Sequence, residues 1–170
     1  IKAAVANGLS LSGHTRLEAE FARIVTSRFP AMELLRFTNS GTEATLLALT
    51  LARITTGRKK VMAFDGGYHG AVFVFKDAVN QTNVPFDWVF APYNDPAAAA
   101  KLIAEHASEL AAVIVEPMQG SGGWIPAGPA VREVAEDEVE RARRPLAHGH
   151  AHDGAAVAHD EYGRFHHVEQ

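Results

Sequence analysis

Short apolar segments alternate with longer stretches of helical pattern through most of the sequence, and this alternation limits the possible folds more than any other feature. Runs typical of buried strands lie at residues 34–38, 60–64, 84–91 and 112–115. Apolar residues at helical spacing predict helices over residues 14–29, 42–55 and 97–110. Because strands that alternate with helices pair in parallel through crossover connections, the sequence predicts an α/β fold, with a mostly parallel sheet and flanking helices.

Residues that break or cap a helix mark the expected ends of these helices. Pro30 stops the first helix, and Gly57 follows the second, where a left-handed conformation is common. Asp95 with Pro96 provides an N-cap and an early proline for the third. The helix over 42–55 carries apolar residues on nearly all sides, which predicts that it is buried.

The composition excludes several classes of protein. The 170 residues include no cysteine, which excludes disulfide frameworks, thiolate zinc sites and cysteine nucleophiles and favours a cytoplasmic location. A formal net charge of −4 argues against a nucleic-acid partner. No apolar run reaches the roughly 20 residues of a membrane-spanning helix, so no membrane partner is expected. The sequence begins with Ile1, without an initiator Met or a signal peptide, and we expect a chain that starts within a longer one.

Charge and histidine are unevenly distributed and divide the sequence into two regions. Residues 1–127 contain 11 Lys and Arg and 11 Asp and Glu, whereas residues 128–170 contain 5 and 9, with six of the nine histidines. We therefore expect a partial globular domain over 1–127 and a weakly structured tail over 128–170. His148, His150 and His152 could bind a metal from one side of a strand, but a solvated tail is the favoured interpretation, so no metal site is predicted.

Three polar segments follow the predicted strands, at residues 39–43, 65–70 and 116–123. Because the carboxyl ends of parallel strands meet at one edge of a sheet, we expect these segments to lie close together. Ligands of open parallel sheets bind outside that edge. The sequence therefore predicts a binding site there.

The first of these segments has two interpretations that the sequence leaves open. Ser40, Gly41 and Thr42 precede a helix, where free N–H groups, hydroxyl donors and a backbone without a side chain favour a phosphate. Glu43, three positions after Ser40, also fits an N-terminal capping box, and the segment by itself favours this cap. A Walker-type phosphate loop is excluded, because its Gly-Lys-Ser/Thr ending is absent.

The other two segments also allow a binding role and a structural role. Tyr68 could stack its ring on a flat cofactor, with His69 as a neighbouring donor or acid–base group, or both could close a tight loop. Glu116, at a strand end before Pro117, could orient a ligand or accept a structural hydrogen bond, and the structural role is favoured.

Four motifs follow one another in the sequence: FTNSGTEA at 37–44, TGR at 56–58, FDGGYHG at 64–70 and VEPMQGSGG at 115–123. In this order and spacing they resemble the class-III aminotransferases that depend on pyridoxal 5′-phosphate (PLP). Within this family, the residues of the four motifs are most similar to those of the glutamate-1-semialdehyde 2,1-aminomutase branch. The resemblance runs from about Leu9 to Ala127 and covers only the N-terminal part of such an enzyme.

This resemblance implies part of the large domain of fold-type-I PLP-dependent transferases, with PLP as cofactor. It also implies a homodimer whose active sites lie at the subunit interface. The implied reaction moves an amino group on a small amino acid or amino aldehyde, with an amino acid or oxo acid as the substrate; the cofactor takes up the charge of the substrate carbanion.

The resemblance also assigns roles to individual residues. The Ser40-Gly41-Thr42 segment would hold the cofactor phosphate, and Tyr68 would lie against the pyridine ring with His69 beside it. Glu116 and Ser121 would lie near the polar edge of that ring.

Two groups that this chemistry requires lack a counterpart. The family places an aspartate beyond the Glu-Pro motif, where it pairs with the ring nitrogen; the string at 137–139 is similar, but no apolar strand precedes it, and we interpret it as a chance match. The Schiff-base lysine is missing, because all the lysines precede the Glu-Pro motif: Lys2, Lys59, Lys60, Lys76 and Lys101. We therefore name no catalytic residue and expect the chain to be inactive alone. The alternative is a non-catalytic protein that binds a phosphorylated ligand or a partner aminotransferase chain.

Overall fold

The computed structural model describes residues 1–6, 8, 13–30, 32–76, 81–131 and 133–134. These residues form two units, one over residues 1–38 and one that begins at Asn39, and each is described by itself. Nearly all of the predicted tail, including the string at 137–139 and six histidines, lies outside the described residues. The tail and its boundary after Ala127 therefore stay predictions.

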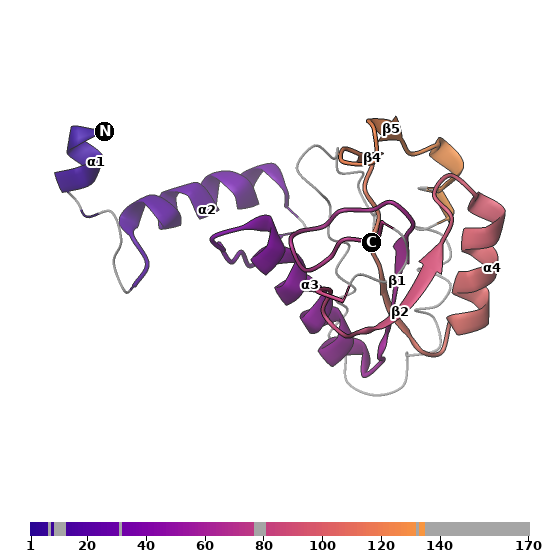
Figure 1. Ribbon diagram of the computed structural model, residues 1–170. Coiled ribbons are helices and arrows are strands. Elements are labelled where there is room, and N and C mark those ends of the chain that lie inside the picture. Colours follow the sequence, from indigo (N-terminus) through magenta and orange to yellow (C-terminus); the bar gives the residue numbers. More distant parts are fainter. Residues whose placement is uncertain (7, 9–12, 31, 77–80, 132, 135–170) are drawn as a thin grey trace. The chain divides into compact units, whose positions relative to one another are not determined.

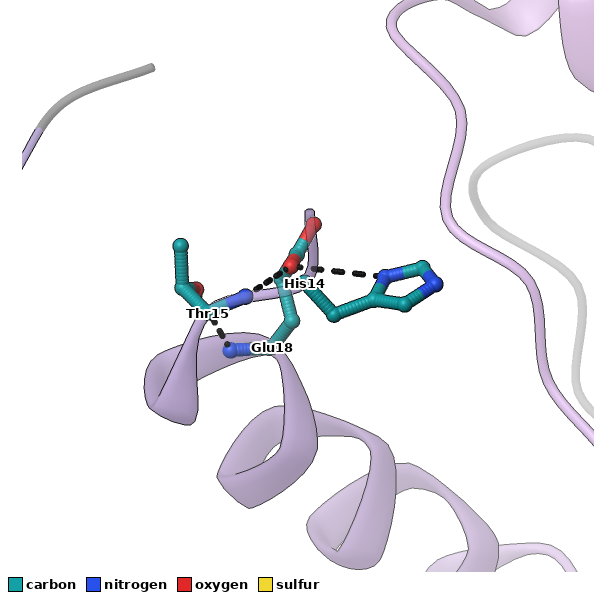
Figure 2. Close-up of polar contacts among 3 residues, drawn as sticks. All are labelled: His14, Thr15 and Glu18. Atoms are coloured by element: carbon teal, nitrogen blue, oxygen red, sulfur yellow. Dashed lines mark hydrogen bonds and ion pairs between the residues drawn. The ribbon is translucent and has the colours of Figure 1, made fainter. Parts of the chain in front are cut away.

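The first unit contains two helices, α1 (Lys2–Ala6) and α2 (Arg16–Arg28). Thr15 is the N-cap of α2. Its side-chain oxygen accepts the Glu18 N–H at 3.2 Å, while the Glu18 carboxylate accepts the Thr15 N–H at 2.6 Å (Figure 2). This reciprocal pair is a capping box. The helix ends before Pro30, as the sequence predicts.

The prediction of a strand over residues 34–38 is wrong, since these residues have no regular secondary structure. Leu34 is 92% exposed, and no strand of the described residues pairs with the segment. Its Phe37 ring stacks instead on Phe21 of α2, with 5.2 Å between ring centroids. An apolar run forms a strand only where a neighbouring strand supplies the hydrogen bonds.

The second unit is a parallel α/β sheet with helices beside it. Its elements are α3 (Gly41–Thr56), β1 (Lys60–Phe64), β2 (Asp87–Ala91), α4 (Pro96–His106), β3 (Leu110–Val113), β4 (Met118–Gln119) and β5 (Ile125–Pro126). β1 pairs in parallel with both β2 and β3, in the order β2-β1-β3, and β4 pairs with β5 as a short antiparallel ribbon. The expected α/β fold with a parallel sheet is confirmed.

The sheet has a helix on each face. Figure 1 shows β1 and β2 between α3 and α4. Successive β1 residues point to opposite faces: Val61 belongs to a core cluster with Leu49 of α3, and Met62 to a second cluster with Ile103 of α4. Val131 is buried in the second cluster, so the core includes residues beyond Ala127.

The element ends agree with the sequence in part. β1 spans the predicted residues, but β2 begins at Asp87, three residues after the predicted start of the strand over 84–91. α4 starts at Pro96 behind the N-cap Asp95, as predicted, but it ends at His106. Leu110, predicted as the last residue of this helix, begins β3 because it pairs with Lys60 of β1.

The prediction that the helix over 42–55 is buried is wrong for most of its surface. Only Leu49 and Ala52 of α3 are buried, whereas Leu47, Leu51 and Ile54 are 46, 57 and 73% exposed. The buried residues lie on the side that packs on the sheet. Although α3 is rich in leucine, none of the helices in the described ranges is long and apolar enough to cross a membrane.

Candidate functional site

The start of α3 combines a side-chain cap with exposed backbone amides. Ser40 is the N-cap, with its Oγ accepting the Glu43 N–H at 3.2 Å, and the Glu43 carboxylate accepts the Asn39 N–H at 2.7 Å. The N–H groups of Gly41 and Thr42 lie in the first turn, where a helix offers them no acceptor of its own. Gly41 is exposed, and a Cβ on it would meet no atom within 4 Å. The cap therefore forms and leaves donors for an anion beside it.

The loop over residues 65–75 is attached directly to this helix start. The Ala71 N–H donates to the Thr42 Oγ1 at 3.0 Å. A Cβ on Gly70, whose φ is +121°, would lie 2.6 Å from Thr42 Oγ1 and 2.7 Å from Thr42 Cα, so only glycine fits there. Because Thr42 Oγ1 accepts this bond from the loop, its own proton can be donated to another acceptor.

Tyr68 and His69 are neighbours on this loop but differ in exposure. Tyr68 is 44% exposed, so its ring is accessible. His69 is buried, and its ring lies against Phe75 with 6.0 Å between ring centroids. The His69 N–H donates to the Phe73 carbonyl at 2.9 Å, which closes the loop on itself. The structure thus offers an accessible aromatic ring beside a buried imidazole.

Glu116 connects this loop to the third segment. It is 5% exposed, and its Oε2 accepts the Tyr68 N–H at 2.8 Å while its Oε1 accepts the Gly120 N–H at 3.4 Å. Its backbone carbonyl accepts the Tyr93 hydroxyl at 2.8 Å. A buried carboxylate needs such partners, and here they are backbone amides of two loops. The structural role that the sequence favours for Glu116 is therefore present; its role toward a cofactor stays a prediction.

The third segment forms β4 and the turn that leads to β5, a ribbon that was not predicted from the sequence. Ser121 lies exposed in its turn. Asn94, in a left-handed conformation after β2, fixes the far side of the ribbon through bonds to the Pro126 carbonyl and the Gly128 N–H. The three glycines at 120, 122 and 123 within four residues are the signal that could have predicted this turn.

Gln119, for which no role was predicted from the sequence, also links two of these segments. This residue is 3% exposed, and its Nε2 donates to the Asp65 carbonyl at 2.7 Å. A long-range side-chain contact of this kind leaves no local pattern, so sequence spacing alone could not have found it.

The three segments therefore lie together at the carboxyl edge of the sheet, as predicted. Bonds link Thr42 to Ala71, Glu116 to Tyr68 and Gln119 to Asp65. Within the ranges that the structure describes, no cluster of His, Asp and Glu could hold a metal ion. The described residues thus form an α/β unit, and the edge where these loops meet is where ligands of open parallel sheets commonly bind.

Comparison with known proteins gives the family. Residues 9–138 match the family described as aminotransferase class-III, and the chain belongs to it. It is 51% identical over 136 residues to the β-phenylalanine transaminase of Variovorax paradoxus. This match covers 78% of this chain and 31% of that protein. It is 40% identical over 134 residues to the glutamate-1-semialdehyde 2,1-aminomutase of Dichelobacter nodosus. This match covers 71% of this chain and 32% of that protein. The resemblance to class-III aminotransferases is confirmed, with higher identity to the transaminase than to this aminomutase.

Solved structures give the same result. The β-phenylalanine aminotransferase of Variovorax paradoxus matches with a TM-score of 0.78 and 46% identity, over 83% of this chain and 33% of that one. A transaminase with PLP bound matches with a TM-score of 0.72 and 30% identity, over 83% of this chain and 36% of that one. The chain thus has part of the fold of PLP-dependent transaminases and spans about a third of the length of these relatives.

Proposed function

We propose that this chain forms the PLP-binding part of a class-III aminotransferase. The observation that carries the proposal is the attachment of the Tyr68 loop to the start of α3, through Thr42 and Ala71. PLP consists of a phosphate group and a flat ring. The helix start supplies donors for the phosphate, and the loop attached to it supplies an accessible aromatic side chain for the ring.

The residues at the helix start fit a phosphate group. Two backbone N–H groups, the Thr42 hydroxyl proton and the positive end of the helix dipole are the donors that bind phosphate in proteins. The position of a Gly41 Cβ is open space, so an anion can approach the backbone closely. On this basis we propose that Ser40, Gly41 and Thr42 hold the phosphate.

We propose that the other predicted residues surround the ring. Tyr68 would lie against it, and His69 would lie behind Tyr68 as a hydrogen-bonding group. Glu116 would lie near the polar edge of the ring and hold the amides of Tyr68 and Gly120 there. Ser121 would reach the same edge of the ring from the turn of the ribbon.

We propose amino-group transfer on a small amino acid or amino aldehyde as the reaction of the whole enzyme. PLP, when bound, takes up the negative charge that develops on the substrate carbon. The name of the relative at 51% identity makes β-phenylalanine the first substrate to test. A cytoplasmic homodimer is part of the same proposal.

We also propose that this chain has no transferase activity by itself. None of its five lysines lies in the segments of the site. Lys60 lies at the amino end of β1, opposite the site, with its Nζ 3.0 Å from Glu109 Oε1 and 3.2 Å from His106 Nδ1. Lys101 lies on α4, 3.7 Å from a carboxylate oxygen of Glu105. An amine that forms a covalent bond with the cofactor must be close to it.

Titration of the full chain with PLP, followed by tryptophan fluorescence, tests the proposal. Thr42→Val keeps the side-chain shape and removes the hydroxyl, and it should weaken PLP binding about tenfold. Thr42→Ser should restore most of the affinity. Thr50→Val, on the same helix but away from its start, is the matched control and should bind as the unmodified chain does.

Inorganic phosphate should compete with PLP in this titration. PLP binding that phosphate does not displace, or that Thr42→Val does not change, would overturn the proposed site. Turnover of β-phenylalanine and an oxo acid well above the rate of free PLP would overturn the proposed lack of activity.

A further inference from the structure

The buried carboxamide of Gln119 joins two loops of the site at a second point, apart from Glu116. Its Nε2 donates to the carbonyl of Asp65, the first residue after β1, at 2.7 Å. The side chain is 3% exposed. Tyr68 is three residues further along the same loop, where the Glu116 carboxylate accepts its N–H. The loop is therefore held at its first residue by Gln119 and at Tyr68 by Glu116.

Two glycines make room for this carboxamide. A Cβ on Gly66 would lie 2.8 Å from Gln119 Oε1, and a Cβ on Gly122 would lie 2.9 Å from the same atom. Both distances are shorter than van der Waals contact. Gly66 also has a φ of +81°, which favours glycine by itself, whereas Gly122 lies outside the left-handed region. At Gly122 the contact with Gln119 is thus the main obstacle to a side chain.

The position of Asp65 and Gly66 determines the shape of the loop beyond them. The Gly66 N–H donates to the Phe75 carbonyl at 3.0 Å, and the Phe75 N–H donates to the Gly67 carbonyl at 2.8 Å. These bonds close the loop, so a shift at its base changes where Tyr68 lies. The Asp65 N–H donates to the Ala91 carbonyl of β2 at 2.9 Å, so β2 holds the amide side of this residue and Gln119 holds its carbonyl side.

We propose that Gln119 is a positioning residue of the PLP site: its carboxamide, held between Gly66 and Gly122, fixes the loop that presents Tyr68 to the cofactor ring. This inference rests on the proposed function. Gln119 acts on the ring side of the site, since the phosphate donors belong to α3. Loss of its contact should therefore weaken binding of PLP and leave binding of inorganic phosphate unchanged.

A double-mutant cycle on the full chain tests this. Gln119→Ala removes the hydrogen bond, and Gly122→Ala displaces the carboxamide; each should weaken PLP binding about three- to tenfold. The double variant should bind no more weakly than Gln119→Ala alone, because Gly122→Ala then has little left to displace. Gly128→Ala is the matched control, since its Cβ would lie 3.7 Å from Asn94 Oδ1, an ordinary contact.

Hydrogen exchange gives a second readout that needs no ligand. The N–H groups of Gly67 and His69 donate to the carbonyls of Phe64 and Phe73, and the Tyr68 N–H donates to Glu116, so all three amides are protected from exchange. They should exchange faster in Gln119→Ala and Gly122→Ala, while amides of α4 keep their rates. If the unmodified chain binds no PLP, the proposed function fails and the exchange rates still test the loop.

Three results would overturn the inference. One is unchanged exchange in the loop of Gln119→Ala. Another is equal loss of PLP and phosphate affinity, which indicates a general loss of structure. The third is an effect of Gly122→Ala that persists in full when Gln119 is already alanine.

Discussion

Two helices of this chain begin with the same sequence pattern, a hydroxyl residue followed three positions later by glutamate, but their starts are built differently. At α2, Thr15 and Glu18 bond to each other reciprocally and the cap is complete (Figure 2). At α3, Ser40 accepts the Glu43 N–H, but the Glu43 carboxylate accepts from Asn39, one residue before the cap. The pattern predicts a helix start in both places and does not distinguish the two arrangements.

The α3 start differs in a second respect, because a distant segment is attached to it. Thr42 accepts a hydrogen bond from Ala71, and Gly70 lies so close that a side chain would not fit. The α2 cap consists of residues within four positions of one another. Substitutions far along the chain should therefore change the α3 start, while only local ones should change the α2 start.

The largest effect is expected for Gly70→Ala. Its Cβ would lie 2.7 Å from the Cα of Thr42, and alanine is strained at a φ of +121°. We expect a loss of about 3 kcal/mol in the free energy of unfolding and loss of PLP binding. Denaturant unfolding and PLP titration measure the two. Gly13→Ala is the control, because its Cβ would meet no atom within 4 Å. A Gly70→Ala variant as stable as this control would show that the close contact does not exist.

The next largest effect is expected for Glu116→Ala. It removes the acceptor of the Tyr68 and Gly120 N–H groups in a buried place, which should cost about 2 kcal/mol of unfolding free energy. Hydrogen exchange should show loss of protection at Tyr68. Glu105→Ala, on the exposed side of α4, should cost little. Retained protection at Tyr68 would contradict the role of Glu116 as the link between the loops.

The sequence predicts those parts of the fold that depend on local pattern or on sheet topology. Lys60–Phe64 is predicted with its true ends, because an apolar run buried on both faces is a strong signal. The meeting of the segments after β1 and β3 follows from parallel pairing, whereas the segment at 39–43 joins them through the bond between Ala71 and Thr42. The helix start at Ser40 is also confirmed. The strand expected before it is wrong, since none of the described strands pairs with that segment.

The remaining features depend on contacts between residues far apart in sequence. Leu110 looks like the last residue of a helix until its pairing with Lys60 places it in β3. Gln119 looks like one polar residue in a glycine-rich turn, and only its bond to Asp65 shows that it holds the loop. Register and packing of this kind are set by the whole sheet, and a single sequence does not contain them as a local signal.

A matched pair of smaller effects tests the comparison of the two helix starts directly. Thr15→Ala and Ser40→Ala each remove a cap and should cost about 1 kcal/mol of local helix stability. Hydrogen exchange at the Glu18 and Glu43 amides measures this. Only Ser40→Ala should also weaken PLP binding. Equal PLP affinity in the two variants would indicate that α3, like α2, has a structural cap only.

The smallest effect is expected for Glu18→Gln in the capping box of α2. Glutamine can accept the Thr15 N–H as glutamate does, so the reciprocal bonds should persist. What is lost is the carboxylate charge near the helix N-terminus and its 3.6 Å contact with His14, whose side chain is 88% exposed. We expect the loss of this charge to lower the local stability of α2 by less than about 0.5 kcal/mol. This loss should be smaller still in high salt, because exposed charges are screened. Exchange of the α2 amides in low and high salt measures it. A loss as large as that of Thr15→Ala, unchanged by salt, would mean that the charge and not the hydrogen bonding of Glu18 holds the α2 cap.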